Sequence, residues 1–96
     1  MAICRIIETG RTPEEYDQVR EKVGIGDTPP AGGKLHIAAR GDDGKIRVIE
    51  VWDSKEQAEA FGEKVMAARN ELGFGGERPS MAYLEVYRTV QDPSGL

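Results

Sequence analysis

Residues 46–54 constrain the fold most, because they join a strand with two apolar faces to a strong helix start. The segment reads IRVIEVWDS and contains the one tryptophan of the chain, Trp52. A strand that is apolar on both faces needs cover on both sides of its sheet. The few polar atoms of this strand lie next to Trp52. The pattern therefore predicts a sheet covered on both faces, with a small pocket near its middle.

The composition is that of a single small globular domain. Hydrophobic residues make up 39% of the 96 residues and charged residues 31%, which is ordinary for such a domain. The net charge of −4 argues against nucleic acid and against an anionic membrane surface as partners. No apolar run approaches the roughly 20 residues of a membrane span, and no signal peptide is evident, so we expect a cytoplasmic protein. The single cysteine, Cys4, is expected to be a buried thiol.

Two segments carry complete helix signals. Residues 12–15 have the threonine, proline and glutamate of a capping box, and Gly24 is placed to end that helix in a left-handed turn. Ser54 begins the second helix, which is expected to run to Leu72. The inward stripe of the second helix consists of Ala58, Phe61, Val65, Ala68 and Leu72.

Four further segments have strand character: residues 2–8, 34–41, 45–52 and 81–90. Between the second and third of these, two aspartates and Gly44 suit a three-residue hairpin loop with a left-handed glycine. This loop pairs residues whose numbers sum to 86. The loop formed by residues 25–33, rich in proline and glycine, separates the first helix from the second strand.

The order of the elements is strand, helix, strand, strand, helix, strand. It predicts an α+β fold, a ferredoxin-like βαββαβ sandwich in which a four-stranded antiparallel sheet has both helices on one face. We expect residues 1–90 to form this domain and residues 91–96 to form a C-terminal tail.

The hairpin register sorts the side chains of the second and third strands into two faces. One face carries Leu35, Ile37, Ala39, Ile49 and Val51, with Arg47 as its one charge. The other face carries His36, Ala38, Arg40, Ile46, Val48, Glu50 and Trp52. Two helices can cover only one face, so a second copy of the chain is expected to cover the other in a twofold homodimer. A two-residue loop in place of the three-residue one would shift these assignments.

The chain resembles the dimeric α+β barrel superfamily, and within it the small bacterial proteins similar to antibiotic-biosynthesis monooxygenases. The resemblance covers nearly the whole chain and rests on three features: the element order, residues 50–54 leading into residues 55–61, and the loop 29–33 before His36. It implies a homodimer whose two sheets face each other as a barrel. It also implies a pocket between sheet and helices on the Trp52 face, with the Leu35 face at the dimer interface.

The chain departs from the catalytic patterns of this superfamily. Its cofactor-free oxygenases acting on aromatic polyketides tend to have an asparagine and a tyrosine where this sequence has Val48 and Ala58. The haem-degrading relatives need a histidine on the helix after the tryptophan, and residues 54–72 contain none. Trp52 alone is carried over from the resemblance.

His36 and Glu50 form the candidate catalytic pair. The register places them directly opposite each other, with Trp52 two residues further along the same face. A carboxylate beside an imidazole orients the ring and makes His36 a candidate acid or base near neutral pH. In the alternative interpretation, the two side chains only satisfy each other in a half-buried position.

Four further residues are candidates for substrate binding. Trp52 either caps the core or stacks on a planar ligand, and Tyr16 and Phe61 either pack in the core or line the same cavity. Arg40 lies on the His36 face but near the turn, so solvent exposure and anion binding both remain open.

The sequence therefore supports two functions. The first is an enzyme that acts on a planar aromatic or polycyclic metabolite by oxygenation, isomerisation or cyclisation. The second is a non-catalytic ligand-binding or structural homodimer. No metal or organic cofactor is expected, because the chain has neither metal-ligand pairs nor a phosphate-binding loop.

Overall fold

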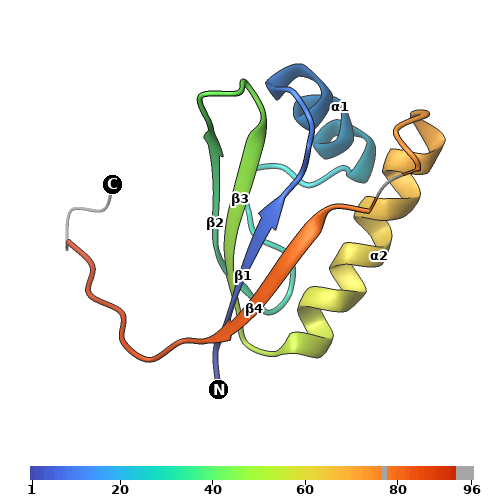
Figure 1. The fold of residues 1–96 in the computed structure, drawn as a ribbon. Coiled ribbons are helices and arrows are strands. Elements are labelled where there is room, and N and C mark those ends of the chain that lie inside the picture. The colour runs from blue at the N-terminus through green and yellow to red at the C-terminus, as the bar shows by residue number, and fades with distance from the viewer. Residues whose placement is uncertain (77, 93–96) are drawn as a thin grey trace.

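The chain folds into a four-stranded antiparallel sheet with both helices packed on one face (Figure 1). The computed structural model describes residues 1–76 and 78–92. Within the sheet the strand order is β2-β3-β1-β4, which is the predicted ferredoxin-like arrangement. The elements are, in chain order, β1 (Ile3–Glu8), α1 (Pro13–Val23), β2 (Gly33–Arg40), β3 (Ile46–Trp52), α2 (Lys55–Glu71) and β4 (Ser80–Glu85).

Both helices begin at the capping residues that the sequence indicates. The Thr12 hydroxyl accepts from the Glu15 backbone N–H at 3.2 Å, and the Glu15 carboxylate accepts from the Thr12 N–H at 2.9 Å. Gly24 ends α1 in the left-handed conformation. The Ser54 side chain caps α2. These caps satisfy backbone donors that a helix leaves unpaired, and so they fix the residue at which each helix begins.

The β2–β3 hairpin has the predicted register over most of its length. His36 faces Glu50, and Gly44 has a φ of +78° in the turn, as the three-residue loop requires. One difference occurs at the start of β2, where Gly33 rather than Lys34 faces Trp52. The pairing shifts by one residue there because the Asp53 N–H donates to the Gly32 carbonyl at 2.8 Å, which leaves an extra residue on β2.

The last strand is shorter than predicted: β4 ends at Glu85 instead of Val90. The reason lies in its neighbour, since β4 pairs with β1 and β1 begins at Ile3. The Val86 N–H still donates to the Ala2 carbonyl at 3.0 Å. Beyond that bond the neighbouring strand β1 has ended, so the alternating residues 87–90 pair with no strand of the described chain. The tail expected from Gln91 lies partly outside the described residues, because 93–96 are not described.

The helix-covered face of the sheet holds two separate core clusters. The first consists of Ile7, Ile46 and Val48, with Tyr16 packed against it. The second consists of Trp52, Ala58 and Phe61, with further partly buried residues around it. The polar side chains of the functional site lie between these clusters.

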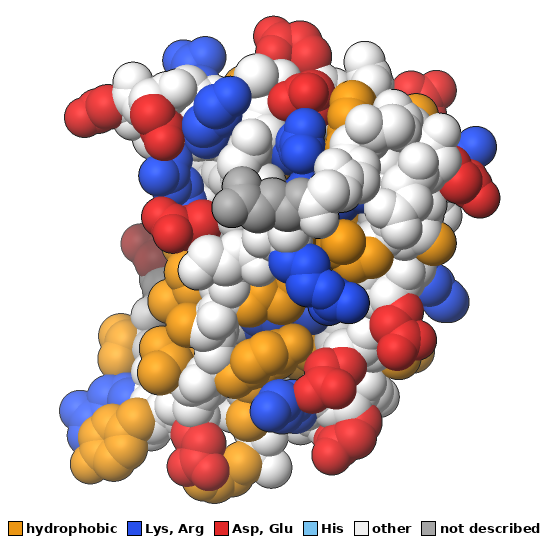
Figure 2. Space-filling view, turned by 45° about the vertical axis from the view of Figure 1, so that its right-hand side comes forward, with side chains coloured by type: hydrophobic (Ala, Val, Ile, Leu, Met, Phe, Trp, Pro, Cys, Tyr) orange, Lys and Arg blue, Asp and Glu red, His pale blue; other side chains and the backbone are white. Residues whose placement is uncertain are grey.

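The opposite face of the sheet carries apolar side chains that neither α1 nor α2 covers. The assignment of Leu35, Ile37, Ile49 and Val51 to this face agrees with the register, and β1 and β4 add Ile6 and Leu84. Ile6, Leu35 and Leu84 are exposed. In Figure 2, hydrophobic side chains gather mainly in the lower left of the view, whereas charged side chains of both signs spread over its upper part.

Candidate functional site

A row of polar side chains crosses the sheet on its helix-covered face. Tyr83 of β4 faces Arg5 of β1, Arg5 faces Glu50 of β3, and Glu50 faces His36 of β2. All four therefore lie at one level of the sheet, one on each strand. Such a row under two helices divides the apolar core, which is why the core consists of two clusters.

Glu50 is the centre of this row and accepts four hydrogen bonds. Its Oε1 accepts from Arg5 Nε at 2.8 Å and Nη2 at 2.6 Å, and from Trp52 Nε1 at 3.0 Å. Its Oε2 lies 3.0 Å from His36 Nδ1. The carboxylate is buried, so these partners replace the water that it loses on folding.

Arg5 is fixed as firmly as the carboxylate that it binds. Its Nη1 donates to the Ala58 carbonyl at 2.8 Å and lies 3.5 Å from the Tyr83 hydroxyl. The α2 residue beside it is Gly62, where an added Cβ would lie 3.1 Å from Arg5 Nη1. The glycine thus lets α2 approach the guanidinium closely.

Glu50 is ionised at neutral pH. Burial alone would raise the pKa of its carboxyl, but the hydrogen bonds from His36 and Trp52 and the charge of Arg5 outweigh burial and lower the pKa. An ionised carboxylate can only accept hydrogen bonds. His36 Nδ1 must therefore carry a proton and donate a hydrogen bond to Glu50. In a neutral imidazole, Nε2 is then an acceptor.

Tyr16 extends the row from the sheet to α1. Its hydroxyl lies 2.5 Å from His36 Nε2, so the phenol donates to the imidazole. Burial raises the pKa of Tyr16, partly offset by the nearby Arg20, which keeps the phenol protonated at neutral pH. Arg20 Nη1 lies 3.5 Å from the same hydroxyl, and its Nη2 donates to the Gly26 carbonyl at 2.8 Å. The result is a continuous chain from Tyr16 through His36 to Glu50 and Arg5.

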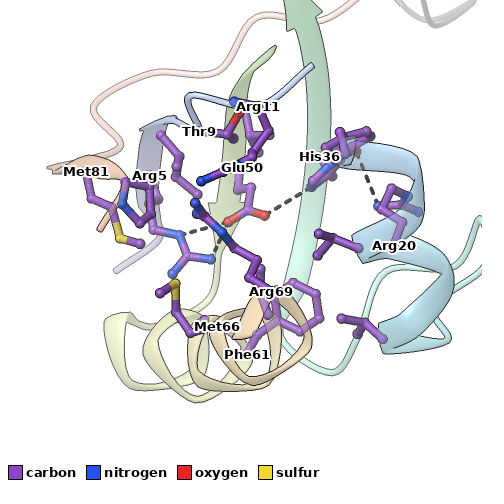
Figure 3. A pocket seen from close by; sticks show the side chains of 18 of the residues that line it. Arg5, Thr9, Arg11, Arg20, His36, Glu50, Phe61, Met66, Arg69 and Met81 are labelled. Carbon is purple, nitrogen blue, oxygen red and sulfur yellow. Dashed lines mark hydrogen bonds and ion pairs between the residues drawn. The ribbon is translucent and has the colours of Figure 1, made fainter. Parts of the chain in front are cut away.

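The chain of hydrogen bonds borders a cavity between the sheet and the helices (Figure 3). The cavity has a volume of about 80 Å³. Most of its apolar walls come from aliphatic side chains and one ring: Ile7, Val19, Val23, Ile25, Val48, Phe61, Val65, Met66 and Met81. A second hollow of about 310 Å³ lies beside the loop that precedes β2, and His36, Glu50 and Phe61 border both spaces.

The structure brings five of the six predicted site residues together. His36, Glu50 and Tyr16 form the hydrogen-bonded chain described above. Trp52 and Phe61 pack against each other with ring centroids 5.4 Å apart, and Trp52 borders the second hollow rather than the 80 Å³ cavity. The sixth, Arg40, is exposed near the β2–β3 turn and is not among the described residues that line either space.

Sequence reasoning missed the arginines of the site. Arg5, Arg11, Arg20 and Arg69 all line the 80 Å³ cavity. The sequence did mark Arg5 as unusual, because a single arginine inside an isoleucine-rich strand needs a hydrogen-bonding partner. Naming that partner requires the register between β1 and β3, and these strands are not joined by a hairpin.

Two kinds of feature are absent from the described residues. No group of three or more His, Cys, Asp and Glu side chains in residues 1–76 and 78–92 is arranged to hold a metal ion. In the same described part of the chain, no helix is long and apolar enough to span a membrane.

The fold is that of a known structure. The chain is similar to a candidate antibiotic biosynthesis monooxygenase of Deinococcus radiodurans, with a TM-score of 0.56 and 14% sequence identity, over 96% of this chain and 98% of that one. This likeness confirms the predicted fold and its resemblance to the monooxygenase-like proteins at the level of structure. No protein-family model matches the sequence, and neither does any curated protein.

Proposed function

We propose that the protein is a small enzyme that moves a proton on a planar aromatic or polycyclic metabolite without a metal or organic cofactor. It would resemble cofactor-independent tailoring enzymes that oxygenate, isomerise or cyclise such compounds. The observation that carries the proposal is the hydrogen-bonded chain from Tyr16 through His36 to Glu50, placed at the wall of an apolar cavity. An oriented base at the wall of an apolar cavity is what proton abstraction from a carbon or phenol requires.

The transfer runs along the chain of hydrogen bonds. The substrate loses a proton to the Tyr16 oxygen while the phenol passes its own proton to His36 Nε2. Tyr16 stays neutral, and His36 becomes an imidazolium whose Nδ1–H points at the Glu50 carboxylate. The substrate keeps the electron pair as an enolate or phenolate. That anion can be reprotonated elsewhere, close a ring, or react with molecular oxygen.

The aromatic rings of Trp52 and Phe61 would hold the planar part of the substrate at the second hollow. This hollow shares His36 and Glu50 with the cavity, which Tyr16 also lines, so a substrate held there would reach the Tyr16 hydroxyl by extending into the cavity. Because Trp52 is the one tryptophan, its fluorescence reports directly on such binding.

A second copy of the chain would cover the open face of the sheet. We propose a homodimer built on Ile6, Leu35, Leu84 and their apolar neighbours. Two observations support it: the face is apolar at its centre, and Arg47, which the register places on this face, is already engaged with Asp43 and Glu8. The pockets lie on the other face, so each subunit would keep its own.

The test uses 2-tetralone, a two-ring ketone with an acidic C–H bond. We expect the protein to catalyse exchange of that proton with deuterium from solvent, followed by NMR in air and under nitrogen. His36→Asn retains a donor toward Glu50 but removes the base, so it should lose the exchange. Tyr16→Phe should lose most of it, and Tyr87→Phe, at an exposed tyrosine, should retain it.

The alternative function is ligand binding without catalysis. One observation favours it: in the free protein both ring nitrogens of His36 and both carboxylate oxygens of Glu50 already have partners. Saturable quenching of Trp52 with no exchange on a panel of enolisable ketones and phenols, in air or nitrogen, would establish this alternative and refute the enzyme.

A further inference from the structure

We propose that the end of the cavity formed by Arg11 and Arg69 binds an anionic group of the ligand, and that the ligand is therefore an aromatic carboxylate. The proposal names the substrate class and rests on the proposed function for the assumption that the cavity binds a small aromatic molecule. It does not depend on proton transfer.

Arg69 is the observation that points to a ligand. It lies on α2, is only 4% exposed, and extends into the cavity (Figure 3). Its buried Nε–H has no acceptor among the described residues, and no ion pair to Arg69 exists within the described part of the chain. Burying a guanidinium with an unpaired donor lowers the stability of the fold. A bound anion would accept from that donor and offset this cost.

Arg5 shows what a satisfied arginine looks like in the same cavity. It is 2% exposed, and all three of its side-chain nitrogens have acceptors, with the Glu50 carboxylate neutralising its charge. Arg69 is almost equally buried but has no such carboxylate partner among residues 1–76 and 78–92. The contrast separates an arginine that the protein itself neutralises from one that it leaves for another molecule.

Arg11 lies beside Arg69 and has a similar deficit. Its Nη2 donates to the Phe74 carbonyl at 3.2 Å, and its Nη1 lies 3.6 Å from the Glu15 carboxylate. Its buried Nε–H, however, has no acceptor among the described residues. Two adjacent arginines thus each present one buried, unmatched donor.

The electrostatics of this end favour an incoming negative charge. Burial lowers the pKa of Arg69, the charge of Arg11 lowers it further, and Glu15 only partly opposes them. A carboxylate between the two guanidinium groups would relieve both their repulsion and their unmet donors. The charges around the cavity also favour an anionic ligand. Four arginines and one glutamate line the cavity, although the net charge of the protein is −4.

A further hollow lies at the same end of the cavity. A third hollow, of about 330 Å³, adjoins the cavity and shares Thr9, Arg11, Arg69 and Pro79 with it. Arg78 also lines this hollow. A ligand that extends from the second hollow through the cavity would therefore place its charged end at the arginines.

The test compares 2-naphthoate with 2-naphthamide, which has nearly the same shape but no charge, by calorimetry on the full chain. We expect 2-naphthoate to bind at least about tenfold more tightly. Arg69→Met and Arg11→Met should each reduce this preference several-fold. Arg88→Met, at an exposed arginine outside the three hollows, should leave it unchanged.

Three outcomes would overturn the proposal. The first is equal affinity for the acid and the amide. The second is an undiminished preference in an Arg69→Met variant that circular dichroism shows to be folded. The third is inorganic phosphate binding as tightly as 2-naphthoate, which would mean a site for free anions and refute the aromatic carboxylate. His36→Asn separates this inference from the catalytic one, since it should keep the preference for 2-naphthoate whether or not exchange is lost.

Discussion

At the scale of single residues, the site is governed by how three buried charges are matched. Glu50 and Arg5 neutralise each other, whereas Arg69 has no such partner among the described residues. A charge that costs stability without a partner in the free protein is best explained by use in binding. The same substitution at the two arginines should therefore have opposite effects on stability.

Arg69→Met should raise the free energy of unfolding of the free protein by about 1 kcal/mol or more, because it replaces an unpaired buried charge with an apolar chain of similar length. Arg5→Met should lower it by about 3–5 kcal/mol, because it leaves the Glu50 carboxylate buried without its cation. Urea denaturation followed by circular dichroism measures both. Destabilisation by Arg69→Met would indicate that this arginine is structural.

Glu50→Gln should destabilise the protein in a pH-dependent way. The folded state lowers the pKa of Glu50 below its ordinary value of 4.5, so the carboxylate stabilises the fold above that pH. This contribution is lost as the pH falls below 4.5 and through the lower pKa of the folded state. Unfolding free energies should therefore differ by roughly 3–5 kcal/mol at pH 7 and converge in acid.

The matched control for this pH dependence is Glu63→Gln, at an exposed glutamate on α2. Its unfolding free energy at pH 7 should match that of the unsubstituted protein, because the side chain is exposed. A constant difference between Glu50→Gln and the unsubstituted protein, from pH 7 down to strong acid, would show that charge at Glu50 does not stabilise the fold.

Part of this residue-level picture follows from the sequence. The hairpin loop sets the register between β2 and β3, so the contact between His36 and Glu50 is confirmed as predicted. The partners of Glu50 on β1 and of Arg5 on β4 depend on pairings between strands far apart in the chain. No turn sets those registers, and so half of the polar row could not be predicted.

At the scale of elements, local signals were sufficient for the helices but not for strand length. Capping residues act within one turn, and both helices begin where the caps indicate. Strand length depends on the partner, and β4 stops because β1 does. The alternating residues up to Val90 therefore gave the wrong end for this strand.

Gly62→Ala should reveal how closely α2 lies against the polar row. Helix propensity alone favours alanine by up to about 1 kcal/mol. The added methyl group would lie 3.1 Å from Arg5 Nη1, so the guanidinium would have to shift by a few tenths of an ångström against its hydrogen bonds to Glu50 and Ala58. We therefore expect a net loss of about 1–3 kcal/mol in unfolding free energy.

Ala60→Gly calibrates this measurement, because Ala60 is exposed on the same helix. It should cost only the propensity difference of up to about 1 kcal/mol. If Gly62→Ala proved more stable than the unsubstituted protein by that amount, Arg5 would have room to shift, and the close packing inferred for α2 would be wrong.

At the scale of the whole molecule, the two faces of the sheet have different uses. Both helices cover the face with the polar row and the cavity (Figure 1), and on the opposite face Ile6, Leu35 and Leu84 are exposed within the described part of the chain. A small domain with a divided core gains little stability from one face alone. Burying the open face against a second copy would add apolar contacts, and these would offset the stability that the core loses to the cavity.

Ile6→Glu tests this dimer at the centre of the open face, where Ile6 pairs with Ile49. We expect the unsubstituted protein to sediment as a dimer at micromolar concentration, and the variant to sediment as a monomer, because a carboxylate would be buried opposite its own copy. Ala67→Glu, which adds the same charge on the exposed side of α2, should remain dimeric. A monomeric unsubstituted protein, or a dimer that Ile6→Glu does not weaken, would mean that the apolar face serves a different partner.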